Sequence, residues 1–230
     1  MKNLSKIGIA LIIALSIIAT GCKKKDSDAP APTSTVDNSV QGKLNSGKSR
    51  KTPLEIYNSD NTLLEELYGK QYAGGLIFYF DFATGSGKVA ATSDQASLVQ
   101  WGCTNDNIGE TFIDPSTGFS NFIWKSMGTA VGSGGLNTSD IVSQCTSTSA
   151  ARVCSNLTVG SNSDWYLASR DELVALLTNV PAITGNYWSS SQTENGTGGS
   201  NVYAVYSNLT YLAIPKANTK NVRAIRDFLQ

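Results

Sequence analysis

The chain has 230 residues, with 18 basic and 18 acidic side chains and no histidine. The missing imidazole excludes Ser-His-Asp triads, Cys-His dyads and His-ligated zinc, whereas carboxylate pairs, lysine and calcium remain open as chemical routes. The balanced charge excludes the broad basic face that nucleic-acid binding requires, and we therefore expect no nucleic-acid partner.

The N-terminus has the layout of a cleaved bacterial secretion signal. Lys2 and Lys6 form a positive start, an apolar run follows, and small residues lead into Cys22. A membrane-spanning helix needs about 20 apolar residues, so this shorter run favours a cleaved signal over an anchor. The Ala-Thr-Gly-Cys sequence that ends at Cys22 resembles the lipobox of bacterial lipoproteins. We therefore predict a lipoprotein signal peptide over residues 1–21 and a diacylglycerol on Cys22.

Residues 22–53 are predicted to be a disordered tether. They are rich in Lys, Asp, Ser, Pro and Asn and hold almost no large apolar residues, so they cannot bury enough surface to offset backbone ordering. Without its signal the chain keeps 16 basic and 18 acidic side chains, a formal charge of −2. Lys23 stands where an acid would favour retention in the inner membrane. We therefore expect a cell-envelope lipoprotein held in the outer membrane by Cys22, and the length of the tether suggests exposure at the cell surface.

A single α+β domain is predicted over residues 54–230. Its first helix is expected over 60–69, where Asp60 or Asn61 can cap the start and Gly69 can end the helix. The apolar and alternating segments of the domain predict strands at 76–80, 88–91, 187–191, 202–206, 211–214 and 222–228. The first two of these strands form a predicted hairpin. Short strands at both ends with helices between them favour α+β architecture over βαβ winding.

The middle of the domain is predicted to hold loops and two helices. Residues 103–138 are rich in Gly, Asn, Ser and Thr and are expected to form loops. One helix is predicted to be capped by residues 138–140 and to end at Cys145. In the next, over 150–157, Cys154 lies on the apolar face, which predicts a buried core thiol.

A capping box predicts a further helix. Ser169 is its N-cap and Glu172 the acid three positions later. The adjacent acids Asp171 and Glu172 resemble a catalytic carboxylate pair, but their place in the capping turn accounts for both. We therefore predict no catalytic residues and no enzyme activity.

Six motifs follow one another in a fixed order between residues 68 and 230. They are Gly-Gly-Leu-Ile-Phe-Tyr at 74–79, Val-Ala-Ala-Thr-Ser-Asp-Gln at 89–95, Trp-Gly-Cys at 101–103, Ser-Asp-Trp-Tyr-Leu-Ala-Ser-Arg-Asp-Glu-Leu at 163–173, Tyr-Trp-Ser-Ser-Ser at 187–191 and Val-Arg-Ala-Ile-Arg at 222–226. In this order they resemble the C-terminal domain of the Legionella collagen-like adhesin, a family long catalogued as a domain of unknown function.

That family is similar to C-type-lectin-like domains and to the formylglycine-generating enzyme. The resemblance implies a C-type-lectin-like domain with short antiparallel strands, two to four helices and long loops. It also implies paired N- and C-terminal strands and helices packed on one side. The best-known member binds sulfated glycans, but it is strongly basic and has a collagen-like stalk, and this chain has neither. Ala168 replaces the family's usual proline, which we expect to affect stability more than function.

With Cys22 acylated, three cysteines remain, which implies one bridge and one thiol or three thiols. Family members with fewer cysteines tend to retain the one that matches Cys154, so the resemblance implies a Cys103–Cys145 bridge. A Cys145–Cys154 bridge and the absence of any bridge stay open as alternatives. The formylglycine-generating enzyme binds copper through cysteines, but these three are widely spaced. We expect no redox chemistry and no cofactor.

A calcium site of the lectin type is not predicted. Calcium-dependent lectins use acids and amides of a long loop together with a Trp-Asn-Asp strand. This chain offers Glu194, Asn195 and Asn201 but no Trp-Asn-Asp. Because calcium takes about 6–8 oxygen ligands, including several carboxylates, we expect no metal here.

Aromatic and amide side chains are the candidate ligand contacts, because ring faces and amides on a rigid scaffold can bind sugars or a protein. The candidates are Trp124, Glu194, Asn195, Asn201, Tyr203, Tyr206, Asn208 and Tyr211, with Asn121 as a further amide. For each of them the alternative is an ordinary structural role. The other three tryptophans, Trp101, Trp165 and Trp188, are expected in the core.

These observations predict a lipid-anchored, non-catalytic binding module of the cell envelope that recognises a glycan or protein ligand. A structural envelope lipoprotein without a soluble ligand is the main alternative. An enzyme of an uncharacterised type is the third.

Overall fold

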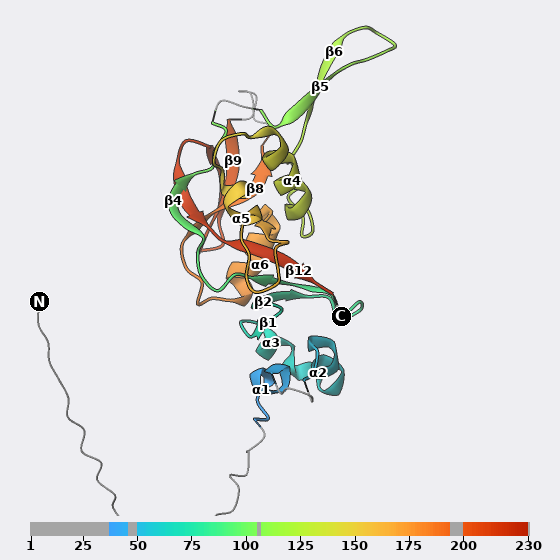
Figure 1. Cartoon of the computed structure of the whole chain (residues 1–230), viewed down its shortest axis with the longest axis vertical. Coiled ribbons are helices and arrows are strands. Elements are labelled where there is room, and N and C mark those ends of the chain that lie inside the picture. Colours follow the sequence, from blue (N-terminus) through green and yellow to red (C-terminus); the bar gives the residue numbers. More distant parts are fainter. Residues whose placement is uncertain (1–36, 46–49, 105–106, 194–199, 230) are drawn as a thin grey trace, which may run out of the picture. The chain divides into compact units, whose positions relative to one another are not determined.

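The computed structural model describes residues 37–45, 50–104, 107–193 and 200–229. Six α-helices, one 3₁₀ turn and twelve strands lie within these ranges. The strands form two five-stranded sheets and one two-stranded hairpin (Figure 1). The predicted α+β class is confirmed. None of the described helices combines the length and the apolar character that a bilayer crossing requires.

Short helices form at the N-terminal end of the domain where side chains cap them. α2 (Pro53–Ser59) starts at Thr52, whose hydroxyl accepts from Glu55 N while the Glu55 carboxylate accepts from Thr52 N. The helix predicted over 60–69 is present as η2 (Asn61–Leu63) and α3 (Leu64–Leu67), with Asp60 as the cap.

Part of the predicted tether is ordered. α1 (Val40–Asn45) lies inside the range 22–53, and its Val40 and Leu44 are 3% and 0% exposed in the main hydrophobic core. The prediction of a disordered tether up to residue 53 was therefore wrong for this helix. The polar average of the segment hid two apolar residues spaced four apart, which is the spacing of one helix face. The signal peptide, Cys22 and the tether up to residue 36 lie outside the described residues.

The first sheet joins the two ends of the domain. Its strand order is β1 (Gln71–Tyr72), β2 (Gly75–Phe80), β3 (Gly87–Ala90), β12 (Ala224–Phe228) and β7 (Tyr166–Leu167). β2 and β3 form the predicted antiparallel hairpin, and β12 pairs antiparallel with β3. The pairing of N- and C-terminal strands that the resemblance implied is thus present.

The second sheet has the order β10 (Tyr211–Pro215), β9 (Asn201–Tyr206), β8 (Asn186–Gln192), β11 (Thr219–Val222) and β4 (Ala96–Gln100). Its one parallel pair, β8 with β11, places Asn221 beside Tyr187. Arg223 alone separates β11 from β12 and so links the two sheets. Its guanidinium is nearly buried, lies 2.7 Å from Asp94 Oδ1 and donates to Ala91 O. Arg223 is thus paired with an acid at the junction of the two sheets.

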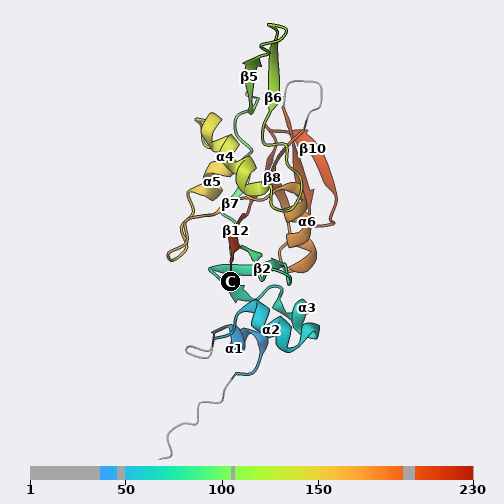
Figure 2. The ribbon, with the colours of Figure 1, turned by 90° about the vertical axis from the view of Figure 1, so that its right-hand side faces the viewer.

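The larger helices cover both faces of the second sheet (Figure 2). α4 (Gly134–Gln144) and α5 (Ala150–Ser155) share a core with Trp188, whereas α6 (Arg170–Asn179) shares the other core with Tyr187. Neighbouring residues of a strand point to opposite faces, so these helices lie on opposite sides of β8. The implied packing of helices on one side was therefore wrong.

Two predictions for the middle of the domain were also wrong. Residues expected to be loop form a hairpin of β5 (Gly109–Ile113) and β6 (Ser120–Trp124). α4 begins at Gly134, four residues before the predicted cap, although Ser133 makes no side-chain cap and glycines are poor helix formers. Tertiary burial of Ile141 and its neighbours on the same face outweighs this weak local sequence.

The predicted core tryptophans are buried and their indole N–H groups are bonded. Trp101 donates to Ser189 O and Trp188 to Val99 O, both at 2.8 Å, and Trp165 donates to Asn162 O at 3.1 Å. Because an unpaired buried N–H would be costly, these bonds fix how the rings sit between the elements.

A buried ionic network connects α6 with the first sheet. Glu172 is fully buried, and its carboxylate accepts from Ser169 N at 2.8 Å and from Gly132 N at 2.9 Å. Lys88 Nζ lies 3.1 Å from the same carboxylate and also donates to the Tyr166 hydroxyl and to Asp227. Two backbone N–H groups and the Lys88 ammonium therefore compensate the buried charge of Glu172, as burial of a carboxylate requires.

The network keeps Lys88 protonated. Burial alone would lower the pKa of Lys88, but the charges of Glu172 and Asp227 together outweigh it and leave the pKa raised. Burial and the neighbouring carboxylates raise the pKa of Tyr166, which therefore remains a neutral donor to Asp227 at 2.7 Å.

Replacing Lys88 by Met should lower the free energy of unfolding by about 3–5 kcal/mol, because it leaves Glu172 charged and buried without its cation. Urea unfolding of the full chain measures this. Lys125→Met is the matched control, because its pair with Glu110 is partly exposed and should contribute less than about 1 kcal/mol. Equal losses in the two variants would contradict the role assigned to the network.

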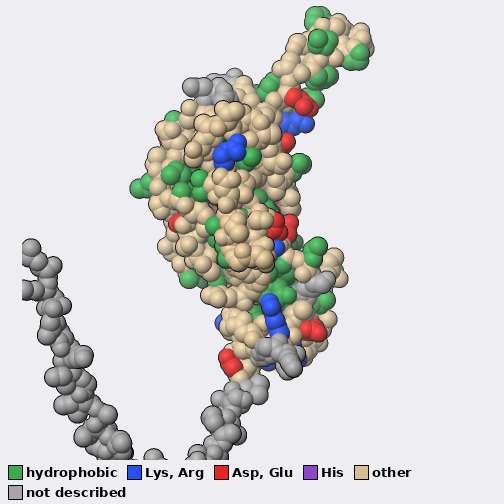
Figure 3. Space-filling model, viewed as in Figure 1, with side chains coloured by type: hydrophobic (Ala, Val, Ile, Leu, Met, Phe, Trp, Pro, Cys, Tyr) green, Lys and Arg blue, Asp and Glu red, His purple; other side chains and the backbone are tan. Residues whose placement is uncertain are grey.

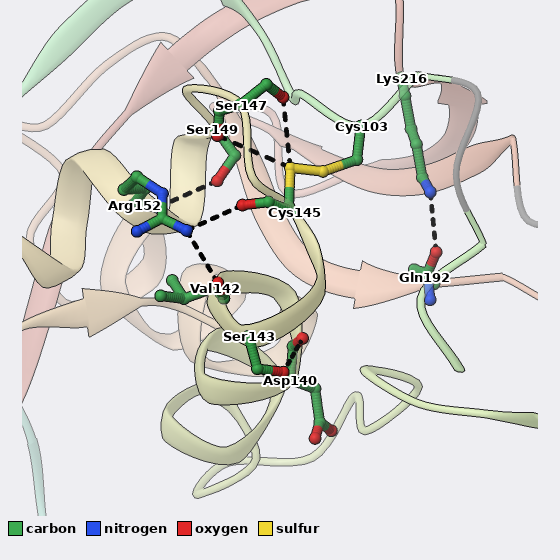
Figure 4. The surroundings of a disulfide bond; sticks show 10 residues. All are labelled: Cys103, Asp140, Val142, Ser143, Cys145, Ser147, Ser149, Arg152, Gln192 and Lys216. Carbon is green, nitrogen blue, oxygen red and sulfur yellow. Dashed lines mark hydrogen bonds between the residues drawn. A yellow bond between two sulfur atoms is a disulfide. The ribbon is translucent and has the colours of Figure 1, made fainter. Parts of the chain in front are cut away.

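The Cys103–Cys145 bridge implied by the resemblance is present, with the two Cα atoms 5.7 Å apart (Figure 4). It ties the chain after β4 to the end of α4. Arg152 supports the same corner by donating to Val142 O and Cys145 O, both at 2.8 Å. Cys154 is a buried free thiol, as predicted, and burial raises its pKa.

Reduction should lower the free energy of unfolding by about 3–4 kcal/mol, because the bridge closes a long loop of the unfolded chain. Urea unfolding with and without reductant measures the loss. The Cys154→Ala variant should keep the full effect of reductant. Loss of that effect in Cys154→Ala would mean that Cys154 takes part in the bridge.

Candidate binding site

The structure places six of the eight candidate ligand contacts, while Glu194 and Asn195 lie outside the described residues. Four of the six lie on β10, an edge strand of the second sheet, and on β9, the strand next to it: Asn201, Tyr203, Tyr206 and Tyr211. Trp124 is on the separate β5–β6 hairpin, and Asn208 is in the turn between β9 and β10.

The three tyrosines project from different faces of the second sheet, because neighbouring residues of a strand alternate between its faces. Tyr211 is directly opposite Val205, and Tyr203 lies two residues from Val205, so both rings project from the face that α6 covers. Their centroids are 5.8 Å apart in an edge-to-face arrangement. Tyr206 projects from the opposite face, where Lys220 lies 5.5 Å from its ring centroid. The three predicted tyrosines are thus a pair and a separate third residue.

Arg170 joins the tyrosine pair. Its guanidinium carbon lies 4.5 Å from the ring centroid of Tyr211 and 5.2 Å from that of Tyr203. Asp171 accepts from Arg170 Nε at 2.7 Å and from a terminal guanidinium nitrogen at 3.2 Å. These hydrogen bonds raise the pKa of Arg170. We refer to Arg170, Asp171, Tyr203 and Tyr211 as the arginine–tyrosine cluster.

The start of α6 sets the position of Arg170. The predicted capping box is present: the Ser169 hydroxyl accepts from Glu172 N, and Glu172 accepts from Ser169 N. Arg170 N donates to Ser191 Oγ on β8 at 3.1 Å, which fixes the first turn against the sheet. The guanidinium therefore reaches the tyrosines from a rigid backbone.

The cluster presents three kinds of contact to solvent. Tyr211 is 46% exposed, and the side chains of Asp171 and Arg170 are 37% and 20% exposed. The exposed ring can stack on an apolar ligand face, the carboxylate accepts hydrogen bonds and the guanidinium donates them. Because the charges of Arg170 and Asp171 cancel, the cluster suits an uncharged polar ligand.

The other placed candidates have structural partners. Trp124 packs edge-on against Phe122 at 4.9 Å. The Asn208 carboxamide oxygen accepts from Thr210 N and Thr210 Oγ1, which shapes the turn. The backbone carbonyl of Asn201 accepts from Thr193 N. These three residues do not belong to the cluster.

A separate cleft of about 700 Å³ lies between α1 and the β1–β2 hairpin. Its walls include Leu44, Gln71 and Tyr72, and the Arg50 guanidinium lies 5.1 Å from the Tyr72 ring centroid. Residues 46–49, which separate Asn45 from Arg50 in the sequence, lie outside the described residues. Across the described part of the chain, no three His, Cys, Asp or Glu side chains come together as a metal site.

Sequence reasoning missed Arg170. The sequence feature that could have identified Arg170 is a basic residue in the first turn of a helix, where the helix dipole favours acids. Such a placement indicates that tertiary contacts hold the cation. The sequence predicted the tyrosines as candidate ring faces, but which of them share a face depends on strand register.

No model of a known protein family matches this chain. Among curated proteins, no similar sequence was found. The role of the cluster is therefore argued from its own geometry.

Proposed function

We propose that this chain is a lipid-anchored, non-catalytic binding module of the cell envelope and that its ligand is an uncharged glycan. The observation that carries the proposal is the arginine–tyrosine cluster, in which an exposed ring stands beside a carboxylate and a guanidinium. Sugars combine apolar C–H faces with hydroxyl groups, which is the combination that such a cluster can recognise.

Each part of the cluster has a distinct role in this proposal. The sugar ring stacks on the exposed face of Tyr211, and Asp171 accepts hydrogen bonds from neighbouring hydroxyl groups. Arg170 donates to a sugar oxygen, and Tyr203 holds the guanidinium in place. A sulfated ligand is disfavoured because Asp171 already neutralises Arg170.

The anchoring half of the proposal is supported by the N-terminal sequence. The positive start, the apolar run and the small residues before Cys22 are those of a lipoprotein signal. Lys23 stands where an acid would favour retention in the inner membrane, so this residue supports sorting of the lipoprotein to the outer membrane. The C-type-lectin-like scaffold remains part of the proposal, supported by the six ordered motifs and by the pairing of β12 with β3.

Replacing Tyr211 by Ala should weaken the affinity of the full chain for an uncharged glycan by about tenfold, because the stacking surface is lost. A glycan array identifies the ligand, and calorimetric titration measures the affinity. Tyr206→Ala is the matched control, because this ring lies on the other face of the sheet and should leave the affinity unchanged.

Asp171→Asn should weaken the same interaction by at least tenfold, since a charge-assisted acceptor is lost and the guanidinium is released. Wild-type protein that binds no glycan on the array would overturn the proposed ligand class. Selective capture of an envelope protein would instead support the protein-ligand alternative.

Replacing Cys22 by Ala should abolish acylation and leave the chain out of the detergent-soluble membrane fraction. Mass spectrometry of the wild-type chain should find an N-terminus at residue 22 that carries diacylglycerol. Cys154→Ala should be acylated normally, because that thiol is buried in the core. An unmodified wild-type chain free in the culture fluid would contradict the anchor.

A further inference from the structure

The β5–β6 hairpin exposes large apolar side chains on both of its faces. Phe112, Ile113, Phe119, Phe122 and Ile123 are between 40 and 72% exposed. The hairpin extends beyond the two sheets, and hydrophobic side chains gather along it (Figures 1 and 3). A two-stranded hairpin is at best marginally stable in water, and contiguous exposed apolar residues mark contact surfaces. The hairpin is therefore a candidate interaction surface.

The hydrogen-bond pattern shows which backbone groups point away from the hairpin. Lys125 N donates to Ile108 O, and Asp114 N donates to Phe119 O, across the two strands. Bonded and non-bonded pairs alternate along an antiparallel ladder. The backbone N–H and C=O groups of Ser120, Phe122 and Trp124 therefore point outward from β6.

The two outer edges of the hairpin differ. On β5, the outward N–H of Gly109 donates to the Gln144 side chain of α4 at 2.8 Å, so this edge is covered at its base. On β6, no group in the described part of the chain bonds the outward backbone of Ser120, Phe122 or Trp124. β6 is therefore an open strand edge, which is a template for another strand.

The turn of the hairpin favours a protein over a lipid surface. Asp114 in this turn accepts from Ser116 N at 2.8 Å and from Ser116 Oγ at 2.6 Å. These hydrogen bonds lower the pKa of Asp114, which keeps its carboxylate charged. If the hairpin entered a bilayer with its turn leading, the charge of Asp114 would move into the hydrocarbon, at a high cost in free energy.

We propose that β6 pairs antiparallel with β6 of a second copy of this chain, about a two-fold axis at Phe122. The two hairpins then form one four-stranded sheet. Phe122 opposes Phe122 of the second copy, and Ser120 opposes Trp124 of the second copy. All outward N–H and C=O groups of these residues gain partners. The central aromatic pair adds a favourable cross-strand contact.

The distribution of charged side chains along β6 supports a second copy of this chain as the partner of that edge. In this register Lys125 opposes Phe119 of the second copy, so no like charges face each other. Lys125 keeps its own partner, because Glu110 of the same hairpin lies 3.0 Å away. Closed two-fold pairing is the commonest way in which identical chains associate, and one self-complementary edge is enough for it.

The test is the self-association of the full chain in detergent, measured by analytical ultracentrifugation over a range of concentrations. Ser120→Pro removes an outward N–H from each copy without touching the bonds to β5, and it should raise the dimer dissociation constant by at least about tenfold. Thr111→Pro removes an outward N–H from the β5 edge and is the matched control. It should leave the dissociation constant within about twofold of the wild-type value.

Phe122→Lys provides an independent variant, because it places two like charges at the axis and should abolish the dimer, whereas Thr111→Lys should not. Near-ultraviolet circular dichroism confirms that each variant is folded. A wild-type chain that stays monomeric at every concentration overturns the proposal. A dimer that persists in both Ser120→Pro and Phe122→Lys overturns it as well.

Discussion

The buried carboxylate of Glu172 is the interaction on which the arrangement of this domain depends. It accepts the Ser169 N–H that starts α6 and the Gly132 N–H that precedes α4, and it is paired with Lys88 of β3. Through Lys88 and Tyr166 the same network reaches Asp227 on β12. One charge thus connects two helices with three strands of the first sheet. A buried carboxylate needs all of these partners, so the helix start cannot shift without losing them.

The geometry of the candidate binding site depends on the same network around Glu172. Arg170 and Asp171 lie between the two members of the capping box, so the position of their backbone is set by Glu172 and by the bond to Ser191. The tyrosines come from β9 and β10, whose register is fixed by pairing with β8. The disulfide acts elsewhere: it fixes Cys145, next to Gln144, which bonds the base of the β5–β6 hairpin. The two surfaces are therefore supported by separate parts of the fold.

Several elements could be predicted because their signals are local. The capping box at Ser169, the β2–β3 hairpin and the apolar face around Cys154 each depend on residues close in sequence. The β5–β6 hairpin was missed although apolar residues flank an Asp-Pro-Ser-Thr-Gly turn, because polar residues dominate the composition of that region. α1 was missed for the same reason. In both cases an average over a segment concealed a short regular pattern.

The sequence by itself determined the signal-like N-terminus, the α+β class, the capping of α6 and the positions of most strands, because these depend on side-chain type and short spacing. Only the tertiary structure decided that Tyr203 and Tyr211 share a face while Tyr206 does not, and that Arg170 completes the pair. It also decided that Lys88 neutralises Glu172 across 84 positions of the sequence. Such pairings depend on strand register and on the packing of distant elements, which no local pattern encodes.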